Sequence, residues 1–389
     1  MQLVAYGAQD IYLTGNPQIT FFKVVYRRHT NFSMEAIEQT WNGTSNANGR
    51  CTATISRNGD LVHRMYLEVT GKLGTDISNP GSSWITDVEL EIGGQKIDKQ
   101  TGHWLELWAE LTRLNPSGTV GLQNNSQFPT ASTLEQKTTG QGGLAGTTAM
   151  ADGTSATRYF VPLQFWFNRN PGLALPLIAL QYHEVKVILQ HNISTVFAGD
   201  GSTVTPTNQL YCDYIYLDTD ERRRFAQVSH EYLIEQVQEQ SYSATSQELN
   251  FNHPVKEIIC SAKDNHVGIS DIGAVTPLSG TACLLKLNGH DRFAARDITY
   301  FTRVQIMDYH SGAGGLECGA AAGEGAHVDT IFVYSFALKP EEHQPSGTCN
   351  FSRIDNAQLT GISNADTVHA VNYNVLRIMS GMGGLAYSN

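Results

Sequence analysis

Charged residues are scarce in this 389-residue sequence, and runs of basic residues are almost absent. Asp, Glu, Lys and Arg together make up 16% of the chain, whereas soluble globular chains typically contain roughly 25%. The net charge is −11 at pH 7, and the longest basic run is Arg222-Arg223-Arg224. A protein that binds nucleic acid directly needs a basic surface to neutralise phosphates. We therefore expect no direct binding of this chain to nucleic acid.

Long apolar runs and paired cysteines are missing as well. No segment approaches the roughly 18 consecutive apolar residues of a membrane-spanning helix, and residues 1–18 lack the basic and apolar parts of a signal peptide. The six cysteines are scattered without a Cys-x-x-Cys pair, so we expect reduced thiols. Five Asn-x-Ser/Thr sequons are candidate glycosylation sites only if the chain enters the secretory route, and are otherwise chance matches. These sequons begin at Asn31, Asn42, Asn124, Asn192 and Asn350.

Motifs that carry chemistry are also absent. The thirteen histidines form no His-x-His, His-x-x-His or His-Glu-x-x-His pattern, and no Gly-x-Ser-x-Gly occurs. The glycine-rich residues 312–325 lack the Lys-Ser/Thr of a phosphate-binding loop, which favours a surface loop. We therefore predict no catalytic residue, no bound cofactor and no metal site.

One string does gather reactive side chains. Residues 339–349 read KPEEHQPSGTC, which includes Glu341, Glu342, His343 and Cys349. Two prolines in the string fix φ and favour a turn between strands over a catalytic cluster. Two other classes of protein stay open. One is a carbohydrate-binding β-sandwich that uses some of the 16 tyrosines, and the other is a jelly-roll enzyme, although the spacing shows no metal ligands or acid pair.

What is present favours β-structure. The sequence is rich in Gly (36 residues), Tyr and Phe, which suits aromatic side chains on pleated faces and turns that need positive φ. Residues 63–71 and 87–98 alternate between apolar and polar, and Gly93-Gly94 and Asn288-Gly289 predict hairpins. Residues 19–26 (ITFFKVVY) are apolar on both faces and predict a strand buried between two layers. Residues 298–307 (ITYFTRVQIM) are interpreted as a further strand.

One segment has helical spacing instead. The side chains Trp104, Leu107, Trp108, Leu111 and Leu114 recur every three or four residues, and Pro116 closes the run. This pattern predicts an amphipathic helix packed over a barrel edge, with both tryptophans on its buried face. Stacking of a sugar on the tryptophans is the less favoured alternative.

The order of elements repeats at about 195 residues, the separation of the two hairpin signals. This repeat predicts an all-β chain of two tandem eight-stranded jelly-roll β-sandwiches, with short helices in the loops. Asp218 followed by Glu221 predicts a short linking helix, in which Arg222, Arg223 and Arg224 are candidate contacts between the barrels or simply solvated charges. The expected division is an arm (1–18), a first jelly roll (19–217) with a long loop (117–157), a linker (218–230) and a second jelly roll (231–389).

Five long strings resemble the major capsid proteins of nucleocytoplasmic large DNA viruses. The first is GAQDIYLTGNPQITFFKVVYRRHTNF (7–32), and the last is VNYNVLRIMSGMGGLAYSN (371–389). Between them lie IGGQKIDKQTGHWLELWAEL (92–111), FWFNRNPGLALPLIALQYHEV (165–185) and FALKPEEHQPSGTCNFSRIDN (336–356). They cover both halves and both ends of the chain, so the resemblance is far more specific than a short motif.

The resemblance implies a double jelly roll that forms homotrimers with a pseudo-hexagonal outline. Such capsomers would tile the icosahedral shell of a large double-stranded DNA virus assembled in the host cytoplasm. The N-terminal arm would face inward, toward minor capsid proteins and, indirectly, an internal membrane. Two similar barrels per chain give six similar wedges per trimer, so that one trimer fills a sixfold-coordinated position.

Overall fold

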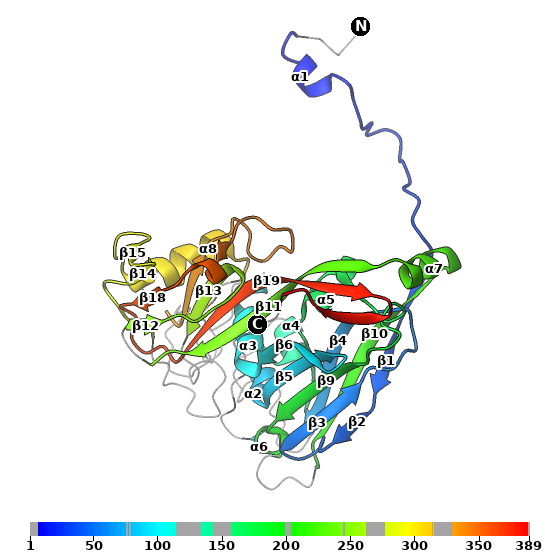
Figure 1. Cartoon of the computed structure of the whole chain (residues 1–389), viewed down its shortest axis with the longest axis horizontal. Helices are drawn as coiled ribbons and strands as arrows, with labels where there is room; N and C mark the ends of the chain where they lie inside the picture. The colour runs from blue at the N-terminus through cyan, green and yellow to red at the C-terminus, as the bar shows by residue number, and fades with distance from the viewer. Residues whose placement is uncertain are drawn as a thin grey trace, which may run out of the picture.

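The computed structural model contains two β-sandwiches side by side and a long N-terminal arm that leaves from one end (Figure 1). The described residues are 7–74, 77, 79–113, 134–142, 157–198, 204–243, 246–261, 277–312, 314 and 329–387. Most of the predicted loop 117–157, most of residues 312–325 and the sequon at Asn124 therefore lie outside the described part of the chain.

The first sandwich consists of two antiparallel sheets. One has the strand order β1-β10-β4-β7, with β8 beside β4, and the other has the order β2-β3-β9-β5-β6. The bounds are β1 Phe32–Gln39, β2 Trp41–Gly43, β3 Gly49–Thr54, β4 Leu61–Gly71, β5 Ile85–Ile92, β6 Gln95–Thr101, β7 Thr157–Pro162, β8 Leu175–Pro176, β9 Val185–His191 and β10 Thr207–Leu217.

The second sandwich repeats this plan. Its sheets have the orders β11-β19-β13-β16, with β17 on β13 and β20 on β19, and β12-β18-β14-β15. The bounds are β11 His230–Ser241, β12 Ser246–Glu248, β13 Pro254–Ser261, β14 Leu284–Leu287, β15 His290–Asp291, β16 Ile331–Ser335, β17 Cys349–Asn350, β18 Ala357–Thr360, β19 Thr367–Met379 and β20 Met382–Leu385.

Both halves have the same connectivity once the short strands β2, β8, β17 and β20 are set aside. In chain order, each remaining set of eight strands forms one sheet in the order first-eighth-third-sixth and another in the order second-seventh-fourth-fifth. This is the strand order of an eight-stranded jelly roll. The predicted fold, two tandem jelly rolls with short helices in the loops, is confirmed.

Local sequence explains the tightest turns. Gly93 and Gly94 join β5 to β6 with φ of +59° and +85°, and Asn288 and Gly289 join β14 to β15 with φ of +51° and +74°. A two-residue hairpin turn needs positive φ at both central positions, which Gly and Asn adopt with little strain. Both predicted hairpins are therefore confirmed.

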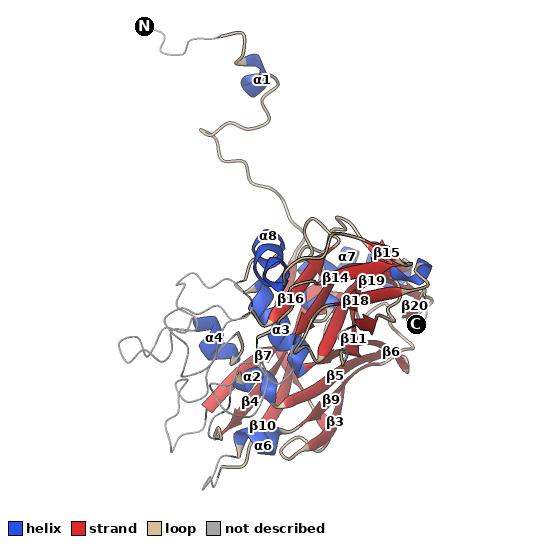
Figure 2. Cartoon of the chain, turned by 90° about the vertical axis from the view of Figure 1, so that its left-hand side faces the viewer, coloured by secondary structure: helices blue, strands red, loops and turns tan. Residues whose placement is uncertain are grey.

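Short helices lie between the strands, except for α1, which lies on the N-terminal arm. They are α1 (Ile11–Thr14), α2 (Pro80–Ser83), α3 (Gly102–Thr112), α4 (Leu134–Thr139), α5 (Trp166–Arg169), α6 (Ile193–Phe197), α7 (Thr219–Gln227) and α8 (Gln305–Tyr309), with 3₁₀ turns η1 (Pro171–Leu173) and η3 (Phe351–Arg353) and a π-helical turn η2 (Tyr300–Val304). Figure 2 shows α3 between the strands of the two sandwiches and α8 beside strand β16 of the second sandwich. The predicted helices at 104–114 and after Asp218 correspond to α3 and α7, and Asp218 caps α7 by accepting a hydrogen bond from the Thr219 N–H (2.8 Å).

Three expectations need correction. Residues 19–26 form no strand and lie on the extended arm, where Phe21 and Phe22 are 92% and 98% exposed, and the first strand begins only at Phe32. Residues 298–307 form the helical turns η2 and α8 instead of a strand. Within the predicted loop 117–157, residues 134–139 form helix α4.

Candidate functional site at the junction of the two sandwiches

Helix α3 connects the fifth and sixth strands of the first sandwich and lies between the two sandwiches. It begins where the Thr101 hydroxyl accepts a hydrogen bond from the Trp104 N–H (3.2 Å), which satisfies one of the free donors of the first turn. It ends at Arg113, whose backbone is extended. All residues from 102 to 111 are buried, so both faces of the helix are covered.

The two faces of α3 belong to different cores. Leu105 packs in the core of the first sandwich. Trp104, Leu107, Trp108 and Leu111 instead pack in a separate cluster with second-sandwich residues. We call this the bridging cluster, and its second-sandwich members are Ile259, Ile306, Ile331, Val333 and Val371. The predicted burial of Trp104, Leu107, Trp108 and Leu111 is confirmed, whereas Leu114 lies outside the described residues. The predicted position over a barrel edge needs correction, because the helix is buried between the two sandwiches and joins them into one body.

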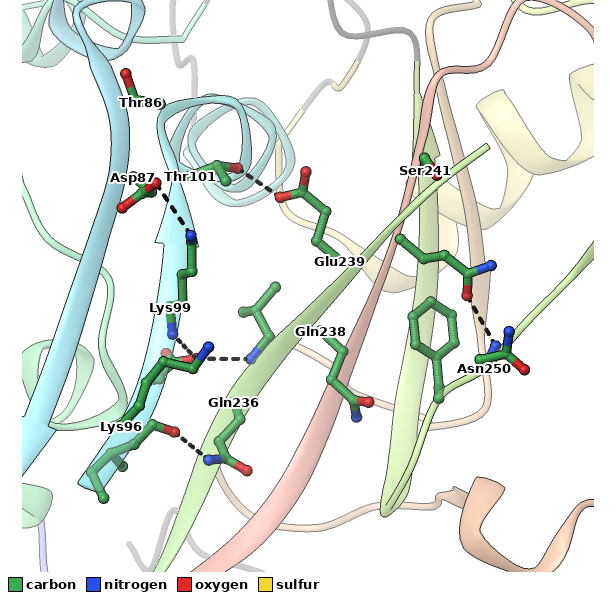
Figure 3. A pocket seen from close by; sticks show the side chains of 15 residues that line it. Thr86, Asp87, Lys96, Lys99, Thr101, Gln236, Gln238, Glu239, Ser241 and Asn250 are labelled. Carbon is green, nitrogen blue, oxygen red and sulfur yellow. Dashed lines mark hydrogen bonds and ion pairs between the residues drawn. The ribbon is translucent and has the colours of Figure 1, made fainter. Parts of the chain in front are cut away.

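Polar contacts extend the junction along strands β6 and β11 (Figure 3). The Gln236 side-chain amide donates to the Ile97 carbonyl, and the Val237 N–H donates to a carboxylate oxygen of Asp98 at 3.1 Å. The Thr101 hydroxyl donates to Glu239 at 3.1 Å. A groove of about 770 Å³ runs beside these contacts. Burial raises the pKa of Asp98 to about 6, although the hydrogen bonds from Val237 and Gln100 lower it.

A buried ion cluster surrounds Glu235 on β11. Its carboxylate lies 3.0 Å from Arg169 of the first sandwich, 3.0 Å from Lys256 and 3.4 Å from His343. The Lys256 side chain is fully buried, and the Arg169 guanidinium also lies over the Trp108 ring, 4.6 Å from its centre. Burial alone raises the pKa of Glu235, but Arg169, His343 and Lys256 outweigh it and lower the pKa to about 2. The carboxylate therefore stays charged and links the two sandwiches electrostatically.

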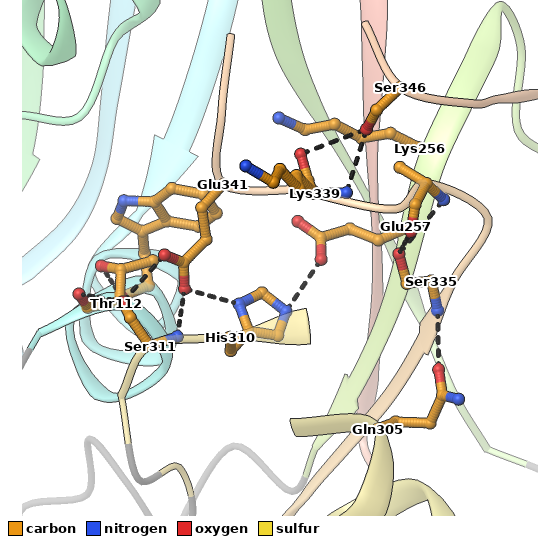
Figure 4. Close-up of polar contacts among 12 residues, drawn as sticks. Thr112, Lys256, Glu257, Gln305, His310, Ser311, Ser335, Lys339, Glu341 and Ser346 are labelled. Atoms are coloured by element: carbon orange, nitrogen blue, oxygen red, sulfur yellow. Dashed lines mark hydrogen bonds and ion pairs between the residues drawn. The ribbon is translucent and has the colours of Figure 1, made fainter. Parts of the chain in front are cut away.

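A second polar cluster centres on His310 (Figure 4). Its ring nitrogens lie 3.0 Å from Glu257 and 3.1 Å from Glu341. The Ser311 N–H donates to Glu341 at 2.7 Å, and the Ser311 hydroxyl donates to the Thr112 carbonyl at the end of α3 at 2.9 Å. Burial lowers the pKa of His310, but the two carboxylates outweigh it and raise the pKa to about 9. His310 is thus a cation at neutral pH, held between two acids beside α3.

Stability is expected to fall at alkaline pH because His310 loses its proton. Its pKa is raised from 6.5 to about 9, so its contribution is fully present below pH 6.5 and disappears as the pH rises through 9. The shift corresponds to about 3 kcal/mol of unfolding free energy. Urea unfolding at pH 6 and pH 9.5 measures it, with His310→Gln against His29→Gln on the exposed arm as the control. If the free energy of unfolding of His310→Gln fell between pH 6 and pH 9.5 as much as that of the unsubstituted chain, the assignment would be contradicted.

The string at 339–349 forms the turn that its prolines indicate, and it reaches the junction. Glu341 contacts His310 and Ser311, His343 contacts Glu235, and Glu342 pairs with Lys339 at 2.8 Å. The sequence gives no direct sign that this turn closes over the two buried ion clusters. The sequence does contain one indirect sign, the charged pair Lys256-Glu257 inside the apolar strand β13. Charged side chains in a buried strand need partners of opposite charge.

The linker arginines and the sequons lie on the surface. Arg222 pairs with Asp60 of the first sandwich (3.0 Å), which ties α7 to that sandwich, while Arg223 and Arg224 are exposed. The described sequon asparagines are exposed: Asn31 on the arm, Asn42 in β2, Asn192 before α6 and Asn350 in β17. Glycosylation at these positions remains a prediction.

No group of three or more metal-ligating side chains with suitable geometry occurs among the described residues. No helix in the described part of the chain is long and apolar enough to cross a membrane.

Comparisons with known proteins agree on one family. A family model described as "Major capsid protein N-terminus" matches residues 20–218, and one described as "Large eukaryotic DNA virus major capsid protein" matches residues 221–384. The chain is 52% identical to a major capsid protein of Pyramimonas orientalis virus, over 100% of this chain and 99% of the relative. It is 40% identical to the major capsid protein of Paramecium bursaria Chlorella virus 1, with the same coverage.

Solved structures show the same likeness. A chain of the PBCV-1 virus capsid superposes with a TM-score of 0.76 and 34% identity, over 95% of this chain and 100% of that chain. The Faustovirus major capsid protein has a TM-score of 0.65 at 13% identity, over 96% and 94% of the two chains, and shows the shared fold. The matched fold, the two family models and the full-length relatives place this chain in the family of major capsid proteins of large eukaryotic DNA viruses.

Proposed function

We propose that this chain is a shell-building subunit that forms homotrimers and has no catalytic role. Each trimer is a pseudo-hexagonal capsomer, and capsomers tile the icosahedral capsid of a large double-stranded DNA virus. The observation that carries this proposal is the identical strand order of the two sandwiches. Three chains supply only threefold symmetry, but two similar wedges per chain give six around one axis.

The contacts across the junction support the same function. A shell subunit has to hold its two sandwiches at one angle, because a hexagonal outline needs equal wedges. The bridging cluster and the buried Glu235 cluster supply apolar and charged contacts across the junction. We propose the following division: an arm up to residue 31, a first jelly roll at 32–217, a linker at 218–230 and a second jelly roll at 231–389.

The arm is the proposed contact to the virion interior. Its residues 19–26 expose Ile19, Phe21, Phe22, Val24, Val25 and Tyr26, each at least 74% exposed. Exposed apolar side chains on an extended segment favour a protein partner that covers them, which we propose is a minor capsid protein. The acidic balance of the chain, −11, supports only an indirect relation to the inner membrane layer and no direct binding of nucleic acid. Assembly is proposed to take place in the host cytoplasm.

The purified chain is expected to be a trimer near 128 kDa, three times 42.7 kDa. Size-exclusion chromatography with light scattering measures the mass in solution directly. A carbohydrate-binding sandwich would instead be a monomer or dimer with measurable sugar affinity. A stable monomer at high protein concentration would contradict the proposal.

A further inference from the structure

Residues 19–26 of the arm, which we call the donor segment, are exposed although their composition is that of a strand. We propose that the donor segment is added as a β-strand to the open edge of a β-sheet in a partner protein, between that sheet and a second layer. This inference rests on the proposed contact of the arm with the virion interior, and it specifies how that contact is made.

The composition of the donor segment favours a strand over a helix. Seven of its eight residues, ITFFKVVY, are β-branched or aromatic, and the exception is Lys23. Such side chains are enriched in strands, and the β-branched ones lose rotamer freedom in a helix. Eight residues are also an ordinary strand length. Turn-forming residues 15–17 precede the segment and Arg27-Arg28 follow it, so the segment has the bounds of one complete strand.

The donor segment has no partner in the described part of the chain. Figure 1 shows the arm running away from both sandwiches. Residues 21 and 22 form a local turn, and residues 24–30 have no regular structure. Among the described residues, no backbone hydrogen bond joins the donor segment to another segment of the chain. Its peptide groups are therefore available to pair with another molecule.

The side chains of the donor segment require cover on two sides. Alternate side chains of a strand point to opposite faces. Six apolar side chains, each at least 74% exposed in the single chain, divide equally between the two faces, with Ile19, Phe21 and Val25 on one and Phe22, Val24 and Tyr26 on the other. A strand that is apolar on both faces belongs between two layers. The docking position is therefore the edge of a sheet that a second layer also covers.

A protein satisfies this segment better than a lipid surface does. A helix that lies on a membrane needs one polar face, and eight residues are far fewer than the roughly 20 that cross a bilayer. An extended segment inserted alone into lipid would leave its backbone N–H and C=O groups without partners. A sheet edge supplies those partners through main-chain hydrogen bonds, while pockets for alternate side chains provide specificity. The partner is therefore a protein with an open sheet edge.

The length of the tether limits where that edge lies. Strand β1 begins at Phe32, which pairs with Leu217 immediately before the linker that contains helix α7. Six residue steps separate Tyr26 from Phe32 (32 − 26), so a fully extended chain spans at most roughly 22 Å between them. The partner's edge is expected within this distance of Phe32, at the end of the first sandwich that carries α7.

Hydrogen exchange tests the inference by comparing the donor segment in purified trimers and in intact virions. In purified trimers its amides are expected to exchange as fast as those of an unfolded peptide. In virions every second amide is expected to exchange at least roughly 100-fold more slowly, because alternate N–H groups of an added strand point toward the partner. Mass spectrometry with residue-resolved fragmentation measures the rates. Strand β19, which has a neighbour on each side in its sheet, is the internal control that is protected in both samples.

A pair of variants tests the main-chain pairing directly. Val24 and Val25 are adjacent residues of one type, and in an added strand one N–H donates to the partner while the other points away. Proline removes the N–H and keeps a backbone that suits an edge strand. One of Val24→Pro and Val25→Pro is therefore expected to lower incorporation of an epitope-tagged chain into virions at least roughly 10-fold, and the other less than about twofold. Light scattering confirms that both variants still form trimers.

Every other outcome overturns the inference. Equal incorporation of the two proline variants, or an equal loss, contradicts main-chain pairing along one edge. Protection of consecutive amides indicates a helix, and protection that disappears when detergent removes the internal membrane indicates lipid. Protection already present in purified trimers assigns the edge to a second copy of this chain instead of a partner protein. Fast exchange in virions overturns the strand and leaves the trimer and the shell standing. Failure of the proposed function appears separately, as a monomeric mass in light scattering of the unsubstituted chain.

Discussion

Leu107→Ala is expected to lower the free energy of unfolding by roughly 2–5 kcal/mol. Leu107 is fully buried in the bridging cluster, so the substitution removes apolar contacts and leaves a cavity between the sandwiches. Alanine keeps the helical preference of α3, so the loss reports packing and not helix formation. Urea denaturation followed by circular dichroism measures the change. A loss below about 1 kcal/mol, typical of surface substitutions, would contradict a tightly packed junction.

Leu105→Ala is the matched control on the same helix. Leu105 is also buried, but it packs in the core of the first sandwich. Both substitutions are expected to destabilise, so a double-mutant cycle with Val371→Ala distinguishes them. Leu107 and Val371 share the bridging cluster, and their coupling energy is expected to be roughly 0.5–3 kcal/mol, against less than about 0.5 kcal/mol for Leu105. Equal coupling for both leucines would mean that α3 does not divide its faces between two cores.

Glu235→Ala is expected to cost roughly 3–5 kcal/mol of unfolding free energy. The substitution leaves the fully buried Lys256 side chain and the largely buried Arg169 without their shared carboxylate. The pKa of Glu235 is lowered from 4.5 to about 2. Its stabilisation is therefore present above pH 4.5 and lost as the pH falls through 2. In urea unfolding measured from pH 5 to pH 2, the free energy of unfolding of the variant is expected to depend less on pH than that of the unsubstituted chain.

Glu231→Gln supplies the control on the same strand. Glu231 pairs with Arg377 at 2.8 Å, but both side chains are more than half exposed. Exposed ion pairs contribute little to stability, so Glu231→Gln is expected to lower the free energy of unfolding by less than about 1 kcal/mol. Its dependence on pH between 5 and 2 is expected to stay unchanged. If Glu235→Ala behaved like this control, the buried cluster would not stabilise the junction.

Elements with strong local signals were predictable from sequence alone. Gly93-Gly94 and Asn288-Gly289 predict their hairpins because the backbone at those positions requires positive φ. The spacing of Trp104, Leu107, Trp108 and Leu111 predicts α3 and its buried stripe. These features depend on a few neighbouring residues, so no knowledge of the tertiary structure is needed.

Apolar content alone misled the prediction in two places. Residues 19–26 have the composition of a buried strand, but in the structure they lie on the extended arm with their apolar side chains exposed. Residues 298–307 are rich in aromatic and β-branched residues typical of strands, yet tertiary packing of Phe301 and Ile306 holds them in helical turns. The wrong choice of period at this short segment concealed a helical connection between the fifth and sixth strands of the second sandwich, β15 and β16, where the first sandwich has α3.

The junction could not be derived from sequence because its partners are far apart in the chain. Arg169 and Glu235 are 66 positions apart, and His310 contacts Glu257 from 53 positions away. Buried charges at Lys256 and Glu257 signal that partners must exist. Only the fold brings the turn at 339–349 over both clusters and identifies those partners.

Electron microscopy of the purified trimer tests the central claim, that one chain supplies two equivalent wedges of a sixfold ring. Class averages along the symmetry axis are expected to show a hexagonal outline with six similar lobes and threefold detail. A three-lobed triangular particle, or two lobes at variable angles in a single chain, would contradict it.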